Sequence, residues 1–147
     1  MDEMDSPIFR IERNPQGEAA LAARRIRYEV FVQEQQVPAA LEWDEHESTS
    51  THYLGYAADG APAATARWRL TPGGKAKVER CAVLAAARGQ GLGAAVVRAV
   101  LADIPPGTPV YLHAQAHAVP FYERLGFEVE GAPFDEAGIA HLRMALR

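Results

Sequence analysis

Three glycines occupy every second position after Arg88, namely Gly89, Gly91 and Gly93. Glycine has no Cβ, so the backbone here can turn sharply and a ligand can approach it closely. Residues 91–101 have a helical pattern, and the first turn of a helix carries unpaired amide donors and the positive end of the helix dipole. With the charge of Arg88 at its mouth, this turn is suited to bind an anion such as a pyrophosphate.

The spacing of these glycines excludes two common phosphate-binding loops. A Walker A loop requires Gly-Lys-Ser/Thr, and no such sequence follows Gly93. The dinucleotide fingerprint requires Gly-x-Gly-x-x-Gly early in a strand–helix–strand unit, whereas this chain has Arg-Gly-x-Gly-x-Gly in its middle. A strand-to-helix turn whose glycines serve close packing alone is the alternative interpretation.

A second stretch, residues 115–127, combines a short helical pattern with aromatic residues. It contains Ala118, Phe121, Tyr122, Glu123, Gly126 and Phe127. The phenol of Tyr122 can protonate a leaving group, or its ring can simply pack on the core. Gly126 is placed to adopt left-handed backbone angles at the end of the helix.

Together the two stretches resemble the motifs of the Gcn5-related N-acetyltransferase (GNAT) superfamily. The coenzyme A loop of that family, Gln/Arg-x-x-Gly-x-Gly/Ala, matches Arg88, Gly91 and Gly93. Its later motif, Asn-x-x-Ala-x-x-Φ-Tyr-Glu-x-x-Gly-Phe with Φ apolar, matches the second stretch, in which Gln115 replaces the asparagine. The resemblance covers residues 8–146.

A finer similarity, to the ElaA-like branch of bacterial GNAT acyltransferases, lies in residues 31–44, 114–116 and 134–141. The resemblance implies direct transfer of an acetyl group from acetyl-CoA, as co-substrate and without a metal, to a primary amine of a small molecule or peptide. It also implies coenzyme A contacts at Cys81, Ala82, Val83, Arg88, Gly89, Gln90, Gly91, Leu92, Gly93, Ala94, Gln115 and Phe121. The backbone of residues 81–83 would align the pantetheine arm and hold the thioester oxygen.

The reaction further needs a base for the acceptor ammonium and an acid for the leaving thiolate. Glu79 is the first candidate for the base, because strand alternation puts it on the same face as Cys81 and Val83, and burial would raise its pKa. A surface or ion-paired glutamate is the alternative. His113 and His141 are alternative bases. Given the motif, Tyr122 is the expected acid.

The acceptor site is expected to include Glu34, Gln35, Glu42, His113 and His141. The acidic residues 42–47 are either a solvated connector or a wall that attracts an amine. A metal site at His46 is disfavoured, since a second histidine at ligand spacing is lacking.

Bulk composition narrows the class of protein. The net charge of −4 argues against a nucleic-acid surface. The single cysteine, Cys81, cannot form an intrachain disulfide, which favours a reducing cytoplasm, and no apolar run is long enough to span a membrane. The competing interpretation is a catalytically inactive coenzyme A-binding regulatory or sensor module. A homodimer would be in keeping with the fold.

The elements that must position these residues follow the order strand, one or two helices, three strands, helix, strand, helix and two strands. Strands are expected at 8–13, 52–58, 62–70, 76–83, 110–115, 127–134 and 139–146, and helices at 18–32, 39–45, 91–101 and 118–125. The resemblance implies the α/β (α+β) GNAT fold, a mixed central sheet of six to seven strands flanked by about four helices. We expect residues 1–147 to form one domain, with residues 1–6 frayed.

Overall fold

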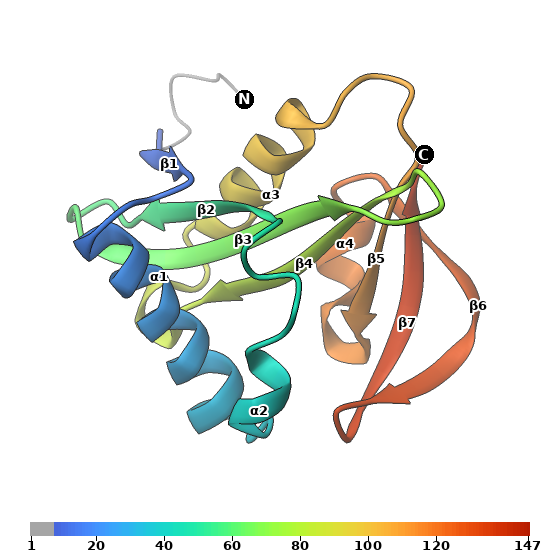
Figure 1. Cartoon of the computed structure of the whole chain (residues 1–147), viewed down its shortest axis with the longest axis horizontal. Coiled ribbons are helices and arrows are strands. Elements are labelled where there is room, and N and C mark those ends of the chain that lie inside the picture. The colour runs from blue at the N-terminus through green and yellow to red at the C-terminus, as the bar shows by residue number, and fades with distance from the viewer. Residues whose placement is uncertain (1–7) are drawn as a thin grey trace.

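The computed structural model describes residues 8–147, and the expected fraying of residues 1–6 falls outside them. Seven strands form one mixed sheet in the order β1-β2-β3-β4-β5-β7-β6 (Figure 1). The strands are β1 Ile11–Arg13, β2 Thr51–Tyr56, β3 Pro62–Leu70, β4 Ala76–Val83, β5 Val110–Gln115, β6 Phe127–Glu136 and β7 Ile139–Leu146. Neighbouring strands are antiparallel except for the parallel pair β4 and β5. The predicted mixed sheet is confirmed.

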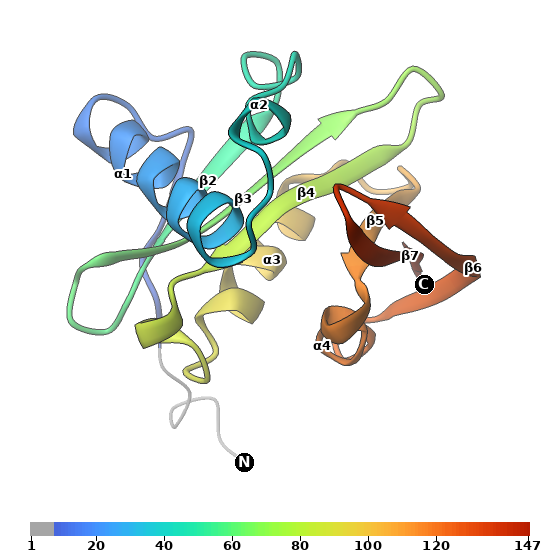
Figure 2. The ribbon, with the colours of Figure 1, turned by 90° about the horizontal axis from the view of Figure 1, so that it is seen from below.

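Helices cover both faces of the sheet. They are α1 Glu18–Arg27, the π-helix η2 Tyr28–Glu34, α2 Ala39–Glu42, the 3₁₀ turn η3 Ala85–Ala87, α3 Leu92–Asp103, the 3₁₀ turn η4 Ala116–Ala118 and α4 Val119–Glu123. Figure 2 shows α1 and α2 on one side of the sheet and α3 and α4 on the other. We call the α1 side the front face and the α3 side the back face.

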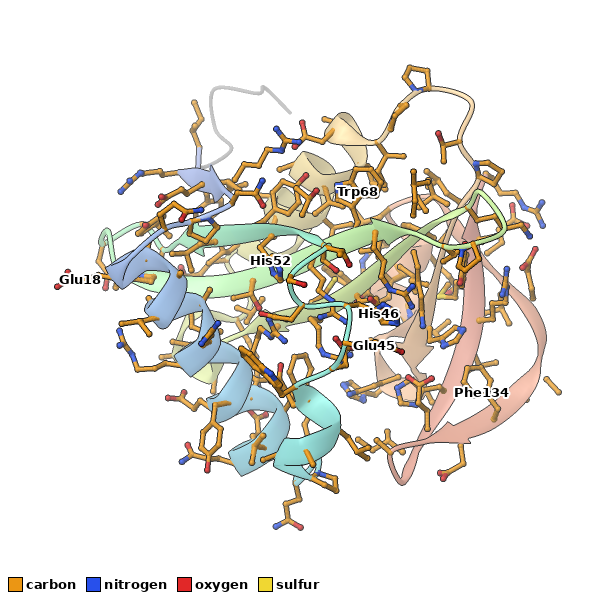
Figure 3. All side chains as sticks on the ribbon, in the orientation of Figure 1. Glu18, Glu45, His46, His52, Trp68 and Phe134 are labelled. Atoms are coloured by element: carbon orange, nitrogen blue, oxygen red, sulfur yellow. The ribbon has the colours of Figure 1, made fainter. Side chains whose placement is uncertain are left out.

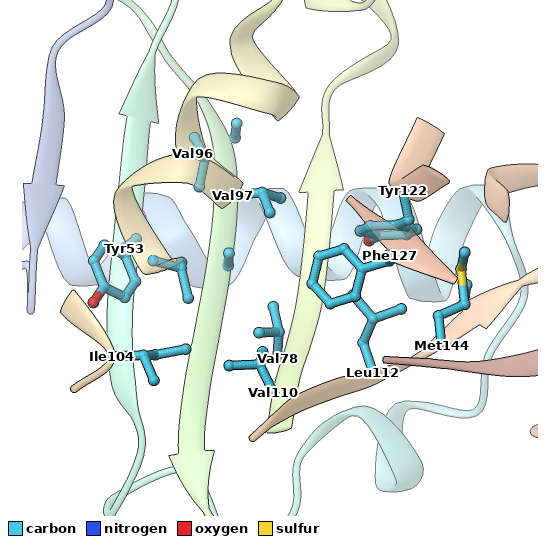
Figure 4. Close-up of a cluster of buried hydrophobic side chains, with 14 of the residues drawn as sticks. Tyr53, Val78, Val96, Val97, Ile104, Val110, Leu112, Tyr122, Phe127 and Met144 are labelled. Atoms are coloured by element: carbon cyan, nitrogen blue, oxygen red, sulfur yellow. The ribbon is translucent and has the colours of Figure 1, made fainter. Parts of the chain in front are cut away.

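Each face has its own apolar core. On the back face, Val96, Val97 and Val100 of α3 pack with alternate residues of the strands, among them Val78 and Leu112 (Figure 4). On the front face, residues 22, 26 and 30, spaced by four, pack against Leu54, Tyr56 and Ala82. Because β-strand side chains alternate between faces, residues next to those of the back core point to the front.

The helix expected at residues 18–32 changes type before its end. The α-helix ends at Arg27 and the chain continues as the π-helix η2. The amide of Gln35 donates to the carbonyl of Val30 at 3.0 Å, which is the wide spacing of a π turn. Such turns are frequent at functional sites. This one ends at Glu34 and is capped by Gln35, two residues of the predicted acceptor site.

A β-bulge in β4 reverses the side-chain alternation on which the choice of Glu79 depended. Thr65 of β3 pairs with Ala82 and Arg67 pairs with Glu79, so two steps on β3 face three on β4. The extra residue, Arg80, has a φ of 55°.

As a result, Cys81 and Val83 pack on the back core, whereas Glu79 contacts Arg67 on the front face. The prediction that Glu79 shares a face with Cys81 and Val83 is wrong, because a bulge adds one residue without any distinctive sequence.

Strands β4 and β5 separate after a short parallel ladder. Ala76, Lys77 and Val78 pair with Val110, Tyr111 and Leu112, and the pairing ends there. Beyond Val78 and Leu112 the two strands pair no further and diverge (Figure 1), as expected for strands that splay beside α3. The predicted site residues of β4 and β5 therefore lie along the two sides of one opening.

Candidate active site

The glycine loop forms the entrance to α3. Gly89 and Gly91 have φ angles of 83° and 87°, in the left-handed region that favours glycine, and Gly91 is the N-cap of α3. No side chain among residues 8–147 caps this helix. A Cβ on Gly93 would lie 3.2 Å from Val83 Cγ2 and 3.5 Å from Phe121 Cζ, so the third glycine allows close packing. The uncapped amides of the first turn fit the pyrophosphate of coenzyme A.

Arg88 sits beside this loop and is held by protein groups. Its Nε donates to the carbonyl oxygen of Val83 at 2.9 Å, and its Nη1 and Nη2 donate to the two carboxylate oxygens of Glu34 at 2.8 and 2.7 Å. The guanidinium lowers the pKa of the Glu34 carboxyl. Both side chains are about two-fifths exposed, so solvent weakens the pair and a bound anion can compete for Arg88.

The residue after Glu34 contacts the other side of the opening. Nε2 of Gln115, at the end of β5, donates to Oε1 of Gln35 at 2.7 Å. The end of η2 therefore spans the gap, with Glu34 bound to the loop after β4 and Gln35 bound to β5. The two residues predicted to bind the acceptor are brought together with Arg88 and Gln115, which were predicted to bind the cofactor.

Tyr122 of α4 approaches the opening from the back face. It is buried beside Phe127 (Figure 4), and its side chain neighbours the thiol of Cys81 on β4. Burial, with the neighbouring thiol, raises the pKa of the Tyr122 phenol well above its usual value. Burial likewise raises the pKa of Cys81 to about 11. At neutral pH both groups carry their protons, so Tyr122 can act as a proton donor and Cys81 is a poor nucleophile.

Glu79 does not have the environment of a general base. It accepts hydrogen bonds from Arg67 at 3.0 Å and Arg69 at 2.9 Å, and Lys77 Nζ lies 3.3 Å from its second oxygen. Burial alone would raise the pKa of Glu79, but the hydrogen bond from Arg69 and the charges of Arg67 and Lys77 outweigh it and lower the pKa to about 2. The structure therefore supports the alternative interpretation of Glu79, an ion-paired glutamate.

Three of the acidic residues in 42–47, Glu42, Asp44 and Glu47, form neither a solvated connector nor a free negative wall, whereas the Glu45 side chain is exposed. Asp44 and Glu47 bind Arg67, whose side chain has no exposed surface, while Glu42 and Glu47 bind Arg27 at 2.6 and 2.8 Å. Burial would raise the pKa of Asp44, but Arg67 and Arg80 lower it to about 2. The carboxylate of Glu42, expected to bind the acceptor, is thus already paired with Arg27.

The central position of Arg67 among the charged residues of the front face was not predicted from the sequence. This residue lies between segments distant in the chain, and a lone arginine in a strand gives no sign of three carboxylate partners. The alternating polar positions of β3, Thr65, Arg67 and Arg69, were the available signal. They place these side chains opposite the back core formed by Ala64 and Ala66.

Two histidines gather around one carboxylate on the front face of the C-terminal strands. Nδ1 of His113 on β5 lies 3.0 Å from Oε1 of Glu136 on β6, and Nε2 of His141 on β7 lies 3.7 Å from Oε2 of the same residue. Phe134 packs edge-on to His113 and stacked with His141, at ring-centroid distances of 4.9 and 6.0 Å. The structure thus brings both predicted histidines together and adds Glu136 and Phe134.

An open hollow of about 510 Å³ lies apart from this histidine cluster. It is lined by His46, Trp68, Arg69 and neighbouring residues at the outer ends of β2 and β3. Figure 3 shows His46 and Trp68 well separated from Phe134 on the C-terminal hairpin. The residues that line this hollow include none of the predicted site residues.

Among residues 8–147, no group of three or more histidine, cysteine, aspartate or glutamate side chains is arranged to hold a metal ion. Within the same residues, no helix has the length and apolar character needed to cross a membrane.

The parted sheet, the glycine loop before α3 and the tyrosine of α4 define an acyl-CoA N-acyltransferase fold. The crystal structure of Escherichia coli ElaA superposes on it with a TM-score of 0.83, at 27% identity, over 95% of this chain and 100% of that one. An acyl-CoA N-acyltransferase from Pseudomonas aeruginosa gives a TM-score of 0.76 at 30% identity, over 95% and 99%.

The chain belongs to the GNAT acetyltransferase family, because the model of the acetyltransferase (GNAT) domain matches residues 11–147. YjcF of Bacillus subtilis, described as an uncharacterized N-acetyltransferase, is 42% identical over 123 residues, covering 81% of this chain and 86% of YjcF. The resemblance deduced from the two motifs, including its ElaA-like branch, is confirmed.

Proposed function

We propose that the protein is an N-acetyltransferase that moves an acetyl group from acetyl-CoA directly to a primary amine of a small molecule or peptide. The observation that carries the proposal is the buried Tyr122 hydroxyl at Cys81, on the edge of the β4–β5 opening and next to the glycine loop. A module that only bound coenzyme A would not need a protonated phenol at this position.

The residues around the opening fit the parts of the co-substrate. The amides of residues 89–94, with Arg88, would hold the pyrophosphate. The backbone of residues 81–83, which borders the gap, would align the pantetheine arm and donate hydrogen bonds to the thioester oxygen as negative charge develops on it. Gln115 and Phe121 would complete the walls.

Tyr122 would supply the proton that the leaving thiolate requires. Its phenol is protonated at neutral pH because burial raises its pKa. A proton donor placed at the sulfur lowers the barrier to breaking the C–S bond, and a positioned acid of this kind typically contributes about 10²–10⁴-fold to the rate.

The test has two parts on the wild-type protein. Calorimetric titration with acetyl-CoA and with coenzyme A should show binding in the micromolar range. A panel of primary amines (amino acids, polyamines and peptides with a free N-terminus) should then release free thiol from acetyl-CoA, with the acetylated amine identified by mass spectrometry. Binding without transfer to any amine would favour the sensor module, and no binding would overturn the proposal.

A further inference from the structure

We propose that His113 is the catalytic base that takes the proton from the acceptor ammonium, and that Glu136 and His141 are positioning residues that fix its orientation. The inference rests on the proposed N-acetyltransferase function. It supplies the general base of that reaction, a role for which the cationic neighbours of Glu79 make Glu79 unsuitable. The supporting observation is that the imidazoles of His113 and His141 both lie next to the carboxylate of Glu136.

The contact with Glu136 determines which nitrogen of His113 is free. Nδ1 lies 3.0 Å from Oε1 of Glu136, and a carboxylate can only accept a hydrogen bond, so Nδ1 carries the hydrogen. The hydrogen bond from His113 lowers the pKa of Glu136, which keeps that carboxyl ionised. The Nε2 atom of His113 is thereby left with its lone pair, on a side chain that is 23% exposed.

His141 and Phe134 hold this arrangement in place. Nδ1 of His141 lies 2.7 Å from the carbonyl oxygen of Ile139 and therefore donates to it, while Nε2 lies 3.7 Å from the second oxygen of Glu136. Phe134 packs against both imidazole rings. A carboxylate between two fixed rings has little freedom to turn away from His113.

The location of His113 suits proton removal from an acceptor. Leu112 is the last residue of β5 that pairs with β4, so His113 is the first residue beyond the point where the strands part. Leu112 and Ala114 pack on the back core, hence His113 points to the front face. Tyr122 reaches the same opening from the back. A base and an acid on different sides of the site suit the transfer, since the amine adds to one face of the thioester carbonyl and the thiolate leaves along a different bond of the resulting tetrahedral carbon.

The charged groups around the cluster are provided by each neighbouring strand. Lys77 of β4 acts electrostatically on Glu136, and Arg143 of β7 pairs in register with His113. The Arg143 guanidinium lies 3.9 Å from the ring centroid of Tyr111 and 3.3 Å from Glu130. Glu136 is thus the anion in direct contact with His113, and Lys77 and Arg143 are the nearby cations that tune the site.

The other titratable groups at the opening are unsuited to be the base. Glu79 is held by Arg67, Arg69 and Lys77 with a pKa of about 2, which makes it a weak base. Cys81 and Tyr122 are protonated and buried at neutral pH. The imidazole of histidine generally titrates near neutral pH, the range a general base needs.

Two protein groups, His113 and Tyr122, transfer protons in the proposed reaction. His113 Nε2 takes one proton from the ammonium, directly or through one water, and the free amine then attacks the acyl carbon, so that the C–N bond forms and the C–S bond breaks. Tyr122 gives its proton to the thiolate and recovers one from the nitrogen of the new amide. His113 releases its proton to solvent, so one proton appears per amide and thiol formed.

The experiment measures kcat/KM against pH with saturating acetyl-CoA and the fastest amine of the panel, for wild type, His113→Asn, Glu136→Gln, Glu136→Asp and the exposed control His117→Asn. We expect His113→Asn to lower kcat about 10²–10⁴-fold and to alter the pH profile of the rate, with the Kd for acetyl-CoA unchanged. Glu136→Gln should lower kcat less, Glu136→Asp should recover part of the loss, and His117→Asn should match wild type.

A second readout does not depend on the amine. In ¹⁵N NMR spectra of the neutral His113 imidazole, Nδ1 should carry the hydrogen and Nε2 should not. The opposite tautomer would overturn the inference, as would a His113→Asn enzyme that keeps its rate and its pH profile. Both results would leave N-acetyl transfer by the wild type intact, whereas a wild type that neither binds acetyl-CoA nor acetylates an amine would overturn the proposed function and this inference together.

Discussion

Gln35 and Gln115, 80 positions apart in the chain, are joined by a hydrogen bond of 2.7 Å. The preceding residue, Glu34, is paired with Arg88 across the same opening. Glu34, the last residue of η2, and Gln35, its C-cap, thus connect to the loop after β4 and to the end of β5, respectively. The segment predicted to face the acceptor is thereby attached to both sides of the predicted coenzyme A site.

Replacement of Arg88 by alanine should weaken acetyl-CoA binding at least about tenfold, because hydrogen bonds to a charged group contribute roughly 1.5–3 kcal/mol. Calorimetry measures the change. Arg98→Ala, an exposed arginine on α3 itself, is the matched control and should bind as wild type does. Equal affinities of the two variants would show that Arg88 serves only its pair with Glu34.

Tyr122→Phe should lower kcat by about 100-fold or more while the Kd for acetyl-CoA stays within twofold, because the phenol acts on the leaving thiolate and not on the bound ground state. Thiol release under saturating acetyl-CoA measures the effect. Tyr56→Phe is the control, since it also removes one hydroxyl hydrogen bond, to Glu12 at 2.7 Å, but on the far strands β1 and β2. A Tyr122→Phe enzyme as fast as that control would contradict the acid role.

Stability should fall as pH is lowered from about 5 towards 2. The pKa of Glu79 is depressed to about 2 in the folded protein from an ordinary value of 4.5, so its contribution is present above pH 4.5 and is lost as pH falls through the folded pKa. The shift corresponds to roughly 3 kcal/mol for this nearly buried group.

Urea unfolding of wild type and Glu79→Gln across this range tests the point. The variant should be less stable at pH 7, and its stability should depend less on pH, with the remaining slope due to groups such as Asp44, whose pKa is also about 2. Parallel slopes for the two proteins would mean that Glu79 is not strongly ion-paired.

Gly55→Ala should destabilise the fold by about 1–3 kcal/mol, because the new Cβ would lie 2.6 Å from Val96 Cγ2 and 3.1 Å from Leu92 Cδ1, where α3 crosses β2. Thermal unfolding should show a lower Tm. Gly73→Ala is the matched control, since its Cβ meets open space, and its stability should stay within about 0.5 kcal/mol of wild type. Equal Tm values would show that α3 can shift away from the sheet.

Local patterns were sufficient to predict most of the fold. Alternation and turn residues placed β7 at residues 139–146 as observed, and Gly126 has the expected positive φ, at 97°. The two family motifs placed Tyr122 and the glycine loop at one opening. Each of these features depends on a single segment of chain, where neighbouring residues carry the information.

The failures arise where distant segments meet. The bulge at Arg80 shifts Glu79 to the front face, and its register is set by pairing with β3. From the sequence alone, the carboxylates of residues 42–47 resemble a solvated acidic segment, because their partners Arg27 and Arg67 are distant in the chain. Glu136 belonged to a segment noted for its similarity, but its role between two histidines needed the three-dimensional arrangement of β5, β6 and β7.

The short ladder between β4 and β5 divides the sheet into two halves that share the back core. Three residue pairs join strands β1–β4 to strands β5–β7, and the Gln35–Gln115 bond crosses further along. A molecule bound between β4 and β5 would replace the missing ladder with its own hydrogen bonds and so bridge the two halves of the sheet reversibly. Binding of such a molecule would therefore also strengthen the connection between the two halves of the sheet.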